Sequence, residues 1–548
     1  MHTNDWSFSR IFLFSASLLA SLLPAAAPAQ SVLGQQEIKD ISIGEVVYPY
    51  ESLDSGGRIT YMAHLPAIKL SEGEFAYLWK PQRKSERMRI VALYNVVMQE
   101  RWQTSFKLEV GEEVIHLFRN EEDLIVMSYE YEWQNREHMV YIRKLDLLTG
   151  DHGERERLFS HKADVNRELF FDFSPDGQQF IVYHYDRFDA VKSFNLLYDY
   201  LYSDERLGHR ANRAEMVRYS RYNTRLEALG KGQIPINPDG SPRIWAMGCQ
   251  LDNAGNIYTT LYEEKTTLSI IQYNVATGTS EKLSFDGYPN MYRMTDPFDT
   301  HLPVEVGNFE KAYVTIAERE KRGGKKQLQE LNLITFDFRA GVVDERRKVN
   351  VNSSLLVGVA KHKRAFGLKA DKSFDNYLIK EIVEMPDQSV WLITQRYEYS
   401  YLGGGFYETR SLANSQASRI EEVILYDFSP EGNFRKAVVV PSFQQADHAK
   451  DLAGHFYTLN VDRDSYEMHF ITHERSGENL KGPHRIFYRK VDLKTGDATP
   501  RKILYEGEKK GQGFYKLYTV WLSSSVVAML VEDGYNGKTY AVSVAVEQ

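Results

Sequence analysis

The sequence predicts an all-β fold built from a repeated four-stranded unit, and three observations support this. A tight polar turn followed by a β-rich run recurs, as at Ser174–Gly177 and Asp252–Gly255. A second turn, rich in Asp, Thr and Gly, joins other β-rich runs at Asp146–Asp151, Asn274–Gly278 and Asp492–Asp497. Aromatic residues form 13% of the 548 residues, which favours β-sheet, and helical periodicity is almost absent.

Eight turn-plus-strand segments, here called anchors, follow one another at a spacing of roughly 50 to 80 residues. The anchors are Ser71–Lys80, Asn120–Glu130, Ser174–Asp186, Asp252–Glu263, Asn308–Glu318, Met385–Arg396, Asp451–Asp462 and Ser523–Glu532. Hairpins are expected after them at Arg89–Leu108, Met139–Phe159, Leu268–Phe285, Leu331–Val349, Glu422–Val440 and Arg485–Tyr505, with weaker versions at Val191–Tyr202 and Thr539–Val546. Regular four-stranded units predict a β-propeller of eight blades, or of seven if the weak first anchor is left out.

The two ends of the chain are predicted to close the ring. The final unit ends with Tyr540–Val546 and has no room for an outer strand. We expect Ile38–Tyr48 to supply that strand, so that residues 30–548 form a single β-propeller domain.

Local phrases resemble known propeller repeats. Phe173–Gly177 resembles the repeat of TolB-like and WD40-like propellers, and the Asp…Thr-Gly-Asp turns resemble those of quinoprotein-type repeats. Over its length the chain is similar to uncharacterised secreted propeller-like proteins of Gram-negative bacteria. Only turns carry these resemblances, so they imply a fold and no activity, and no cofactor is expected.

Residues 1–29 have the order of a secretory signal peptide. Arg10 precedes an apolar run from Ile11 to Leu23, and small residues lead to a cleavage site after Ala29. The alternative is an uncleaved anchor, but the run is shorter than a membrane span needs. We therefore expect a periplasmic or secreted protein with no membrane span after cleavage.

The net charge and the cysteine content limit the partners and the covalent cross-links that can be expected. The formal net charge of -8 argues against a nucleic-acid partner and gives no support to binding an anionic membrane. Cys249 is the single cysteine, so an intramolecular disulfide is excluded, and its apolar surroundings predict a buried structural thiol.

The connections divide between two faces. In a four-stranded blade, the first-to-second and third-to-fourth turns open on one face, here called the tight-turn face, because their turns are short throughout. The opposite, loop-rich face is predicted to carry the long segments Glu205–Pro242, Asp286–Gly307, Asn350–Asp375 and Ser400–Ser418. Binding residues concentrate on such loops, so this face and its channel mouth are the predicted site.

The segment Arg206–Lys231 contains the first candidate ligand-binding residues, Arg218, Arg221 and Tyr222. Guanidinium groups beside aromatic rings can grip carboxylates, phosphates or sugar acids. The alternative is a solvated, partly helical insertion whose arginines pair with neighbouring glutamates.

The second candidate segment is a glycine hinge flanked by aromatic residues, Arg396–Tyr407. Its expected ligand-binding residues are Arg396, Tyr399, Tyr401 and Tyr407, with the rings stacking on sugars or peptides. The alternative is a hairpin tip in which Tyr399 and its alternate neighbours are strand residues.

No metal site or catalytic residue is predicted. Asp296–His301 and Asp462–Asp464 match no calcium-loop spacing, so turn chemistry is the favoured role of their carboxylates. The histidine pairs His448/His455 and His469/His473 lack an HExxH pattern, and no Gly-x-Ser-x-Gly nucleophile elbow occurs.

These features predict an exported, monomeric binding module that engages a protein, peptide or glycan of the cell envelope. The alternative is a propeller-type glycan hydrolase or lyase with acids from several blades at the channel mouth. A third possibility is a purely structural envelope component.

Overall fold

The computed structural model describes most of the chain between residues 32 and 546. The described residues are 32–38, 41–42, 67–81, 87–187 (except 133, 136 and 163–168), 214–237, 244–286 (except 264–265), 304–350 (except 308 and 323–324), 359, 377–400, 417–446 (except 443), 458–475, 484–505, 512–514, 518–533 and 538–546.

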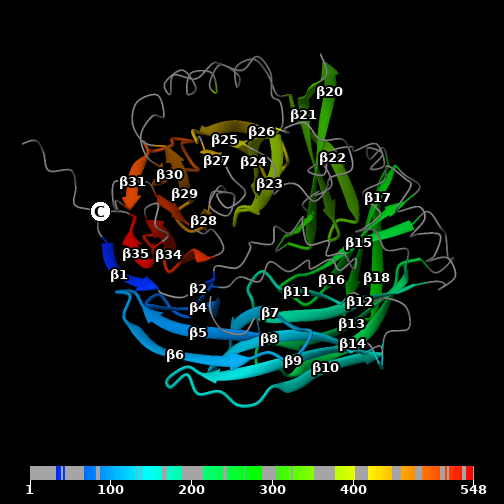
Figure 1. Ribbon diagram of the computed structural model, residues 1–548. Coiled ribbons are helices and arrows are strands. Elements are labelled where there is room, and N and C mark those ends of the chain that lie inside the picture. Colours follow the sequence, from blue (N-terminus) through cyan, green and yellow to red (C-terminus); the bar gives the residue numbers. More distant parts are fainter. Residues whose placement is uncertain are drawn as a thin grey trace, which may run out of the picture.

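The chain forms eight antiparallel, mainly four-stranded blades arranged in a ring, a β-propeller (Figure 1). Blade 1 contains β2 (Ile41–Ser42), β3 (Ala67–Lys69), β4 (Glu74–Pro81), β5 (Met88–Asn95) and β6 (Glu100–Lys107). Blade 2 contains β7 (Glu112–Arg119), β8 (Asp123–Glu132), β9 (Glu137–Asp146) and β10 (Glu156–Lys162). Blade 3 contains β11 (Phe170–Phe173), β12 (Gln179–Arg187), β13 (Ala214–Asn223) and β14 (Ala228–Pro235). Blade 4 contains β15 (Ile244–Leu251), β16 (Ile257–Glu263), β17 (Thr267–Asn274) and β18 (Thr279–Asp286).

The second half of the ring repeats this order. Blade 5 contains β19 (Val304–Val306), β20 (Lys311–Arg322), β21 (Lys325–Asp337) and β22 (Val342–Asn350). Blade 6 contains β23 (Tyr377–Glu384), β24 (Val390–Ser400), β25 (Ala417–Phe428), β26 (Phe434–Val440) and β27 (Gln444–Ala446). Blade 7 contains β28 (Thr458–Asp462), β29 (Glu467–Arg475), β30 (His484–Asp492) and β31 (Lys502–Tyr505). Blade 8 contains β32 (Gln512–Phe514), β33 (Val520–Trp521), β34 (Val526–Asp533), β35 (Lys538–Ala545) and β1 (Val32–Ile38). The all-β propeller is confirmed, with eight blades rather than seven.

An apolar cluster lies between each pair of neighbouring blades. Among the described residues there are eight such clusters, one for every interface of the ring. Ile270 of blade 4, for example, packs with Val314 and Phe336 of blade 5. Cys249 lies in the cluster between blades 3 and 4 as a buried thiol, as predicted. Each blade therefore buries both of its faces against its neighbours.

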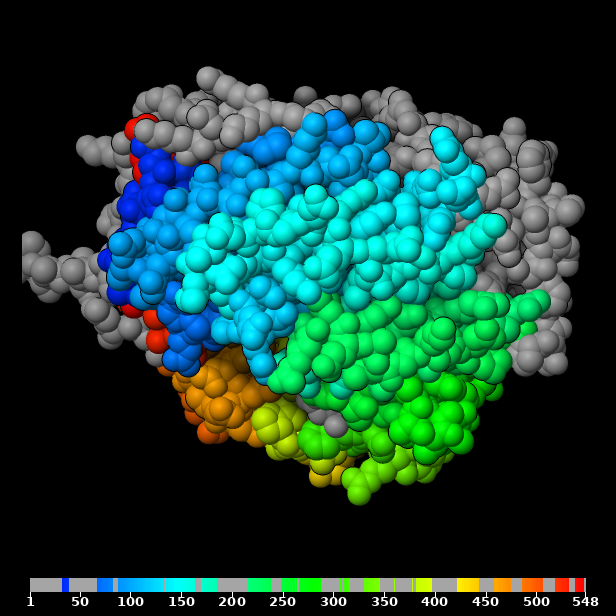
Figure 2. Space-filling view, turned by 90° about the horizontal axis from the view of Figure 1, so that it is seen from below, coloured from blue at the N-terminus to red at the C-terminus, as the bar shows by residue number. Residues whose placement is uncertain are grey.

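The ring is closed by the N-terminal strand. β1 pairs antiparallel with β35, from Val32 opposite Val544 to Ile38 opposite Thr539. Figure 2 shows this blue segment against the red C-terminal strands. The prediction that an N-terminal strand closes the ring is confirmed, but its position at Ile38–Tyr48 was wrong. The strand was misplaced because β1 is a largely exposed outer strand whose sequence shows little apolar alternation. Ile41–Ser42 instead pairs with β4 in blade 1.

The recurring Asp/Gly turn is stabilised by the side chain that begins it. Asp146, Asn274 and Asp492 open equivalent turns in blades 2, 4 and 7. Each side-chain Oδ1 accepts from the backbone N–H groups two and three residues later, at 2.7 to 3.1 Å. The fifth residue is always a glycine in the left-handed region: Gly150 (φ 74°), Gly278 (φ 71°) and Gly496 (φ 81°). These two requirements, a capping Asp or Asn and a glycine four residues later, explain why the turn can be recognised in the sequence.

Two expected segments were wrong. The seventh anchor, Asp451–Asp462, was placed too early, because the corresponding turn is at 462–466 and Tyr466, not a glycine, takes the left-handed conformation (φ 61°). The predicted long loop Glu205–Pro242 contains β13 and β14, and in β13 Arg218 alternates with the core residues Val217 and Tyr219. The weak hairpin Val191–Tyr202 lies outside the described residues.

Gly34 tests the ring closure. A Cβ on Gly34 would overlap the backbone carbonyl of Val97 in blade 1, whereas a Cβ on Gly73 would meet no atom within 4 Å. We expect Gly34→Ala to lower the free energy of unfolding by about 1–3 kcal/mol, because backbone cannot yield as a flexible side chain does. Gly73→Ala is the matched control. Equal melting temperatures for the two variants in a thermal unfolding assay would contradict the described closure.

Asp492 tests the turn chemistry through pH. The N–H groups of Thr495 and Lys494 lower the pKa of Asp492 below its ordinary value despite partial desolvation. The ionised turn is therefore stabilising above the unfolded pKa of about 3.9, and this stability is lost as pH falls through the folded value. Asp492→Asn keeps the acceptor, as Asn274 does naturally, but cannot titrate. We expect the variant to lose less thermal stability than wild type below about pH 4; identical acid profiles would contradict this.

Candidate functional site

The strand topology confirms the assignment of turns to two faces. The turns at residues 174–178, 252–256, 385–389, 146–151, 274–278, 429–433 and 492–497 join first to second or third to fourth strands. The connections at residues 188–213, 287–303, 351–376 and 401–416 begin and end at the opposite, loop-rich face. Those four connections lie outside the described residues, apart from Val359, so the site is built here from the strand ends beneath them.

The three candidates of the first segment do not form one site. All three lie in β13, where Arg218 is half-buried opposite His184, whose ring stacks on His161 of blade 2 at 3.8 Å. Arg221 donates to the Gly255 carbonyl of blade 4 at 2.9 Å. Tyr222 is 8% exposed and stacks on Phe180 in the core, where burial raises its pKa.

The second segment is partly strand. Tyr399 lies in β24 opposite Ser418, so the strand alternative is confirmed for this residue. Tyr401 and Tyr407 lie outside the described residues, and their binding role stays a prediction. Arg396 is 5% exposed and donates to Glu421 at 2.7 Å. As it stands, the guanidinium therefore holds a carboxylate of its own chain.

A buried tyrosine–carboxylate pair lies beside this ion pair. The hydroxyl of Tyr377, from β23, donates to Glu422 of β25. Burial and the nearby Glu422 raise the pKa of Tyr377 well above its ordinary value, while Arg396 opposes the shift. Tyr377 is thus a neutral donor, and it belongs to the apolar cluster between blades 5 and 6.

Blade 7 carries a second buried ion cluster at the same end. Glu474, near the loop-rich end of β29, has no exposed surface and accepts from Arg489 and Thr472, each at 2.6 Å. Arg501 approaches the other carboxylate oxygen at 3.5 Å. Desolvation lowers the pKa of Arg501 from its ordinary value, with Glu474 opposing this. Two guanidinium groups therefore compensate one buried carboxylate.

In blade 2 the ratio of arginine to glutamate is reversed. Arg155 lies 2.8 Å from Glu130 and 3.2 Å from Glu112, above the Tyr141 ring at 3.9 Å. Ser128 donates to the other oxygen of Glu112 at 2.5 Å. Burial raises the pKa of Tyr141, and Arg155 opposes the rise. One guanidinium thus bridges two carboxylates from neighbouring strands.

These three clusters form a charged layer beneath the loop-rich face. Their carboxylates are already bound by arginine, tyrosine, serine or threonine within their own blades. They join neighbouring strands near the loop-rich end of each blade. Sequence reasoning missed them, although charged residues inside apolar strands, as in Arg419–Glu422, were a visible signal.

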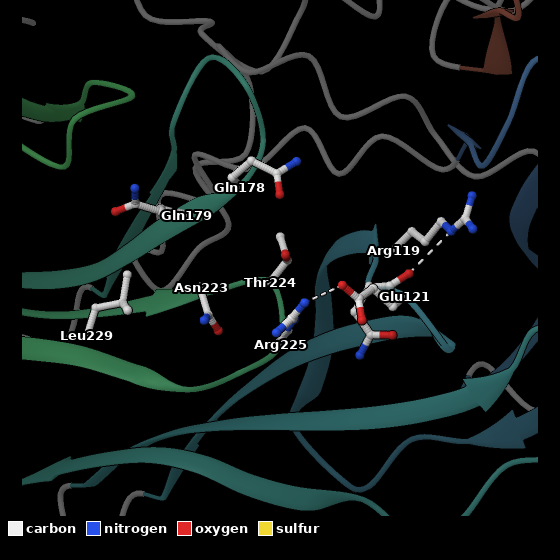
Figure 3. A pocket seen from close by; sticks show the side chains of 9 residues that line it. Arg119, Glu121, Gln178, Gln179, Asn223, Thr224, Arg225 and Leu229 are labelled. Atoms are coloured by element: carbon white, nitrogen blue, oxygen red, sulfur yellow. Dashed lines mark hydrogen bonds and ion pairs between the residues drawn. The ribbon is translucent and has the colours of Figure 1, made fainter.

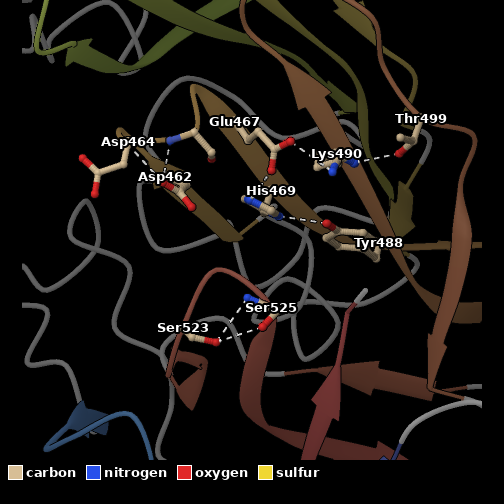
Figure 4. Close-up of polar contacts among 10 residues, drawn as sticks. Asp462, Asp464, Glu467, His469, Tyr488, Lys490, Thr499, Ser523 and Ser525 are labelled. Atoms are coloured by element: carbon tan, nitrogen blue, oxygen red, sulfur yellow. Dashed lines mark hydrogen bonds and ion pairs between the residues drawn. The ribbon is translucent and has the colours of Figure 1, made fainter. Parts of the chain in front are cut away.

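Asp462 and His469, two of the residues considered as metal ligands, have hydrogen-bond partners within blade 7. In Figure 4, Asp462 accepts from the N–H groups of Asp464 and Ser465 at 3.1 Å, which is the predicted turn chemistry. His469 contacts the Tyr488 hydroxyl at 2.8 Å and lies 3.7 Å from Glu467. No group of three or more potential metal ligands occurs within the described part of the chain. Asp296–His301, His448 and His455 lie outside it.

No protein-family model matches the chain, and no curated protein matches it in sequence. Solved structures of similar fold include the WD40 domain of SCAP from fission yeast (7% identity, TM-score 0.34, covering 88% of this chain and 94% of that one). The polysaccharide lyase Uly1 has 9% identity and a TM-score of 0.39 (94% and 100%). Dipeptidyl peptidase 4 of Porphyromonas gingivalis has 9% identity and a TM-score of 0.35 (91% and 67%). The propeller assignment rests on the blade topology itself.

The Arg396–Glu421 pair is directly testable. Arg396→Met leaves the Glu421 carboxylate buried without its guanidinium, and we expect a loss of about 3–5 kcal/mol in the free energy of unfolding. The double variant Arg396→Met/Glu421→Leu removes both charges and should recover most of this loss. Denaturant unfolding measures both. A double variant as unstable as the single one would show that an unpaired charge is not the cause.

Proposed function

We propose that the chain is an exported β-propeller that binds a protein, peptide or glycan of the cell envelope on its loop-rich face. The observation that carries the proposal is the segregation of connections, with short self-stabilised turns on one face and the long connections on the other. A rigid scaffold that concentrates long connections on one face is the usual arrangement of a binding surface.

The charged layer supports the same proposal. Just beneath the loop-rich face, Arg396 is held by Glu421 of a neighbouring strand, Glu474 by Arg489 of β30, and Arg155 by Glu112 and Glu130 of two strands. Such a layer keeps the strand ends rigid, so the connections above it start from fixed positions. Within the described residues, no helix is long and apolar enough to cross a membrane. Export with removal of residues 1–29, a monomeric state and a periplasmic or secreted location complete the proposal.

The test is capture of a ligand by the purified protein. Envelope extract of the producing organism is passed over the immobilised protein, and the same protein is applied to a glycan array. Tyr401→Ala/Tyr407→Ala should reduce capture at least tenfold if each ring contributes about 1 kcal/mol or more. Leu148→Ala, an 88% exposed apolar residue on the tight-turn face, is the control and should leave capture unchanged.

Three results would contradict the proposal. Failure to capture any ligand, together with turnover on a panel of polysaccharides, would favour the glycan hydrolase or lyase. An equal loss of capture in Tyr401→Ala/Tyr407→Ala and in Leu148→Ala would show that the loop-rich face does not bind the ligand. If mass spectrometry shows that the protein isolated from the periplasm or the medium retains residues 1–29, cleavage after Ala29 is contradicted.

A further inference from the structure

A pocket of about 610 Å³ lies on the tight-turn face, between blades 2 and 3. Three turns line it, as Figure 3 shows: β7–β8, β11–β12 and β13–β14. The lining residues are Arg119, Asn120, Glu121, Gln178, Gln179, Asn223, Thr224, Arg225 and Leu229. The pocket is on the face opposite to the one proposed above.

The walls of the pocket are held by hydrogen bonds within the turns. Asn120 Oδ1 accepts from the N–H groups of Glu122 and Asp123 at 2.9 and 2.6 Å. Asn223 accepts from the Glu227 N–H at 2.9 Å and donates to its carboxylate at 2.7 Å. The backbone around the pocket is therefore preformed, as small-molecule sites usually are.

Several polar groups of the lining keep hydrogen-bonding capacity for a ligand. Among the described residues, no hydrogen bond engages the amide nitrogen of Asn120, the amide oxygen of Gln178 or the hydroxyl of Thr224. Together they offer a donor, an acceptor and a group that is both. Sugar hydroxyls also donate and accept, so they match this set.

The lining of the pocket carries two guanidinium groups, Arg119 and Arg225, in a chain of net charge -8. It also contains the Glu121 carboxylate, and the carboxylate of Glu227, which is bonded to Asn223, lies near Arg225. Arg119 donates to the backbone carbonyls of Asn120 and Leu70, and no carboxylate of the described residues pairs with it. Arg225 pairs with Glu121, and both are exposed, at 60% and 72%. An exposed pair of this kind opens at little cost to admit a competing carboxylate.

We propose that this pocket is a binding site for an acidic saccharide. The sugar carboxylate replaces Glu121 on Arg225 and approaches Arg119, while the ring hydroxyls bond Asn120, Gln178 and Thr224. Leu229 is the single apolar residue of the lining, so the pocket offers little to the apolar side chains of a peptide.

The experiment measures binding by isothermal titration calorimetry at low salt. The probes are trigalacturonate, a hyaluronan tetrasaccharide and sialyllactose, with neutral galactotriose and tri-aspartate as controls. At least one acidic saccharide should bind more tightly than both controls, and more weakly as salt is added. Arg225→Gln should weaken it about tenfold or more, since a charged hydrogen bond is lost.

Two further variants separate recognition from stability. Glu121→Gln removes the internal competitor and should strengthen binding severalfold. Arg101→Gln disrupts a comparable exposed pair, 3.1 Å from Glu74 in blade 1, and should leave affinity unchanged. Tyr401→Ala/Tyr407→Ala should also leave it unchanged, so that this site and the loop-rich face fail or succeed separately.

The proposal is overturned if none of the three acidic saccharides binds. It is equally overturned if tri-aspartate binds as well as they do, which would make the site one for acidic peptides. Equal effects of Arg225→Gln and Arg101→Gln, or weaker binding by Glu121→Gln, would show that the pocket is not the point of contact.

Discussion

The antiparallel pairing of β1 with β35 is the contact on which the ring depends. Eight blades have eight interfaces only when the last blade meets the first, and that interface is one of the eight apolar clusters. Ile38 of β1 packs there with Tyr77 of blade 1 and Leu530 of blade 8. Without β1, the edge of β35 would present unpaired backbone groups beside the fully buried Val542. When β1 is paired, both faces of each blade are covered. The strand ends that carry the loop-rich face and the pocket are then held in fixed positions.

Polar interactions are distributed differently on the two faces. On the tight-turn face, side chains such as Asp146 and Asn274 bond the backbone of their own turn. Beneath the loop-rich face, Arg155, Arg396 and Glu474 bond side chains of other strands. The first arrangement stabilises each turn from within, and bonds such as Arg221 to the Gly255 carbonyl then link turns of neighbouring blades, whereas the second ties several strands together. Buried ion pairs are weak evidence for stability but suit a surface that must keep one geometry.

Much of the fold was predictable because its turns depend on local chemistry. An Asp or Asn that bonds the next backbone amides, followed by glycine in the left-handed region, has the same signature in any blade. The prediction failed where the signature was missing, as at Tyr466, and where a strand was too exposed to show apolar alternation, as in β1. The candidate site was harder to predict because its partners are distant in sequence. Arg155 contacts Glu112 of β7 although β8 and β9 lie between them in the sequence, so no local sequence pattern predicts that contact.

Closure by β1 also determines when the ring can be completed during synthesis. Val32 is among the first residues of the fold to be made, and its partner Val544 is among the last. The blades between them can form in order, because each is a local antiparallel unit, but the seam must wait until β35 has been made. Until then β1 has no strand partner in the nascent polypeptide, and blade 1 lacks one neighbour. A chain interrupted before blade 8 is complete therefore leaves two unsealed edges, which makes truncated products the aggregation-prone form of this protein.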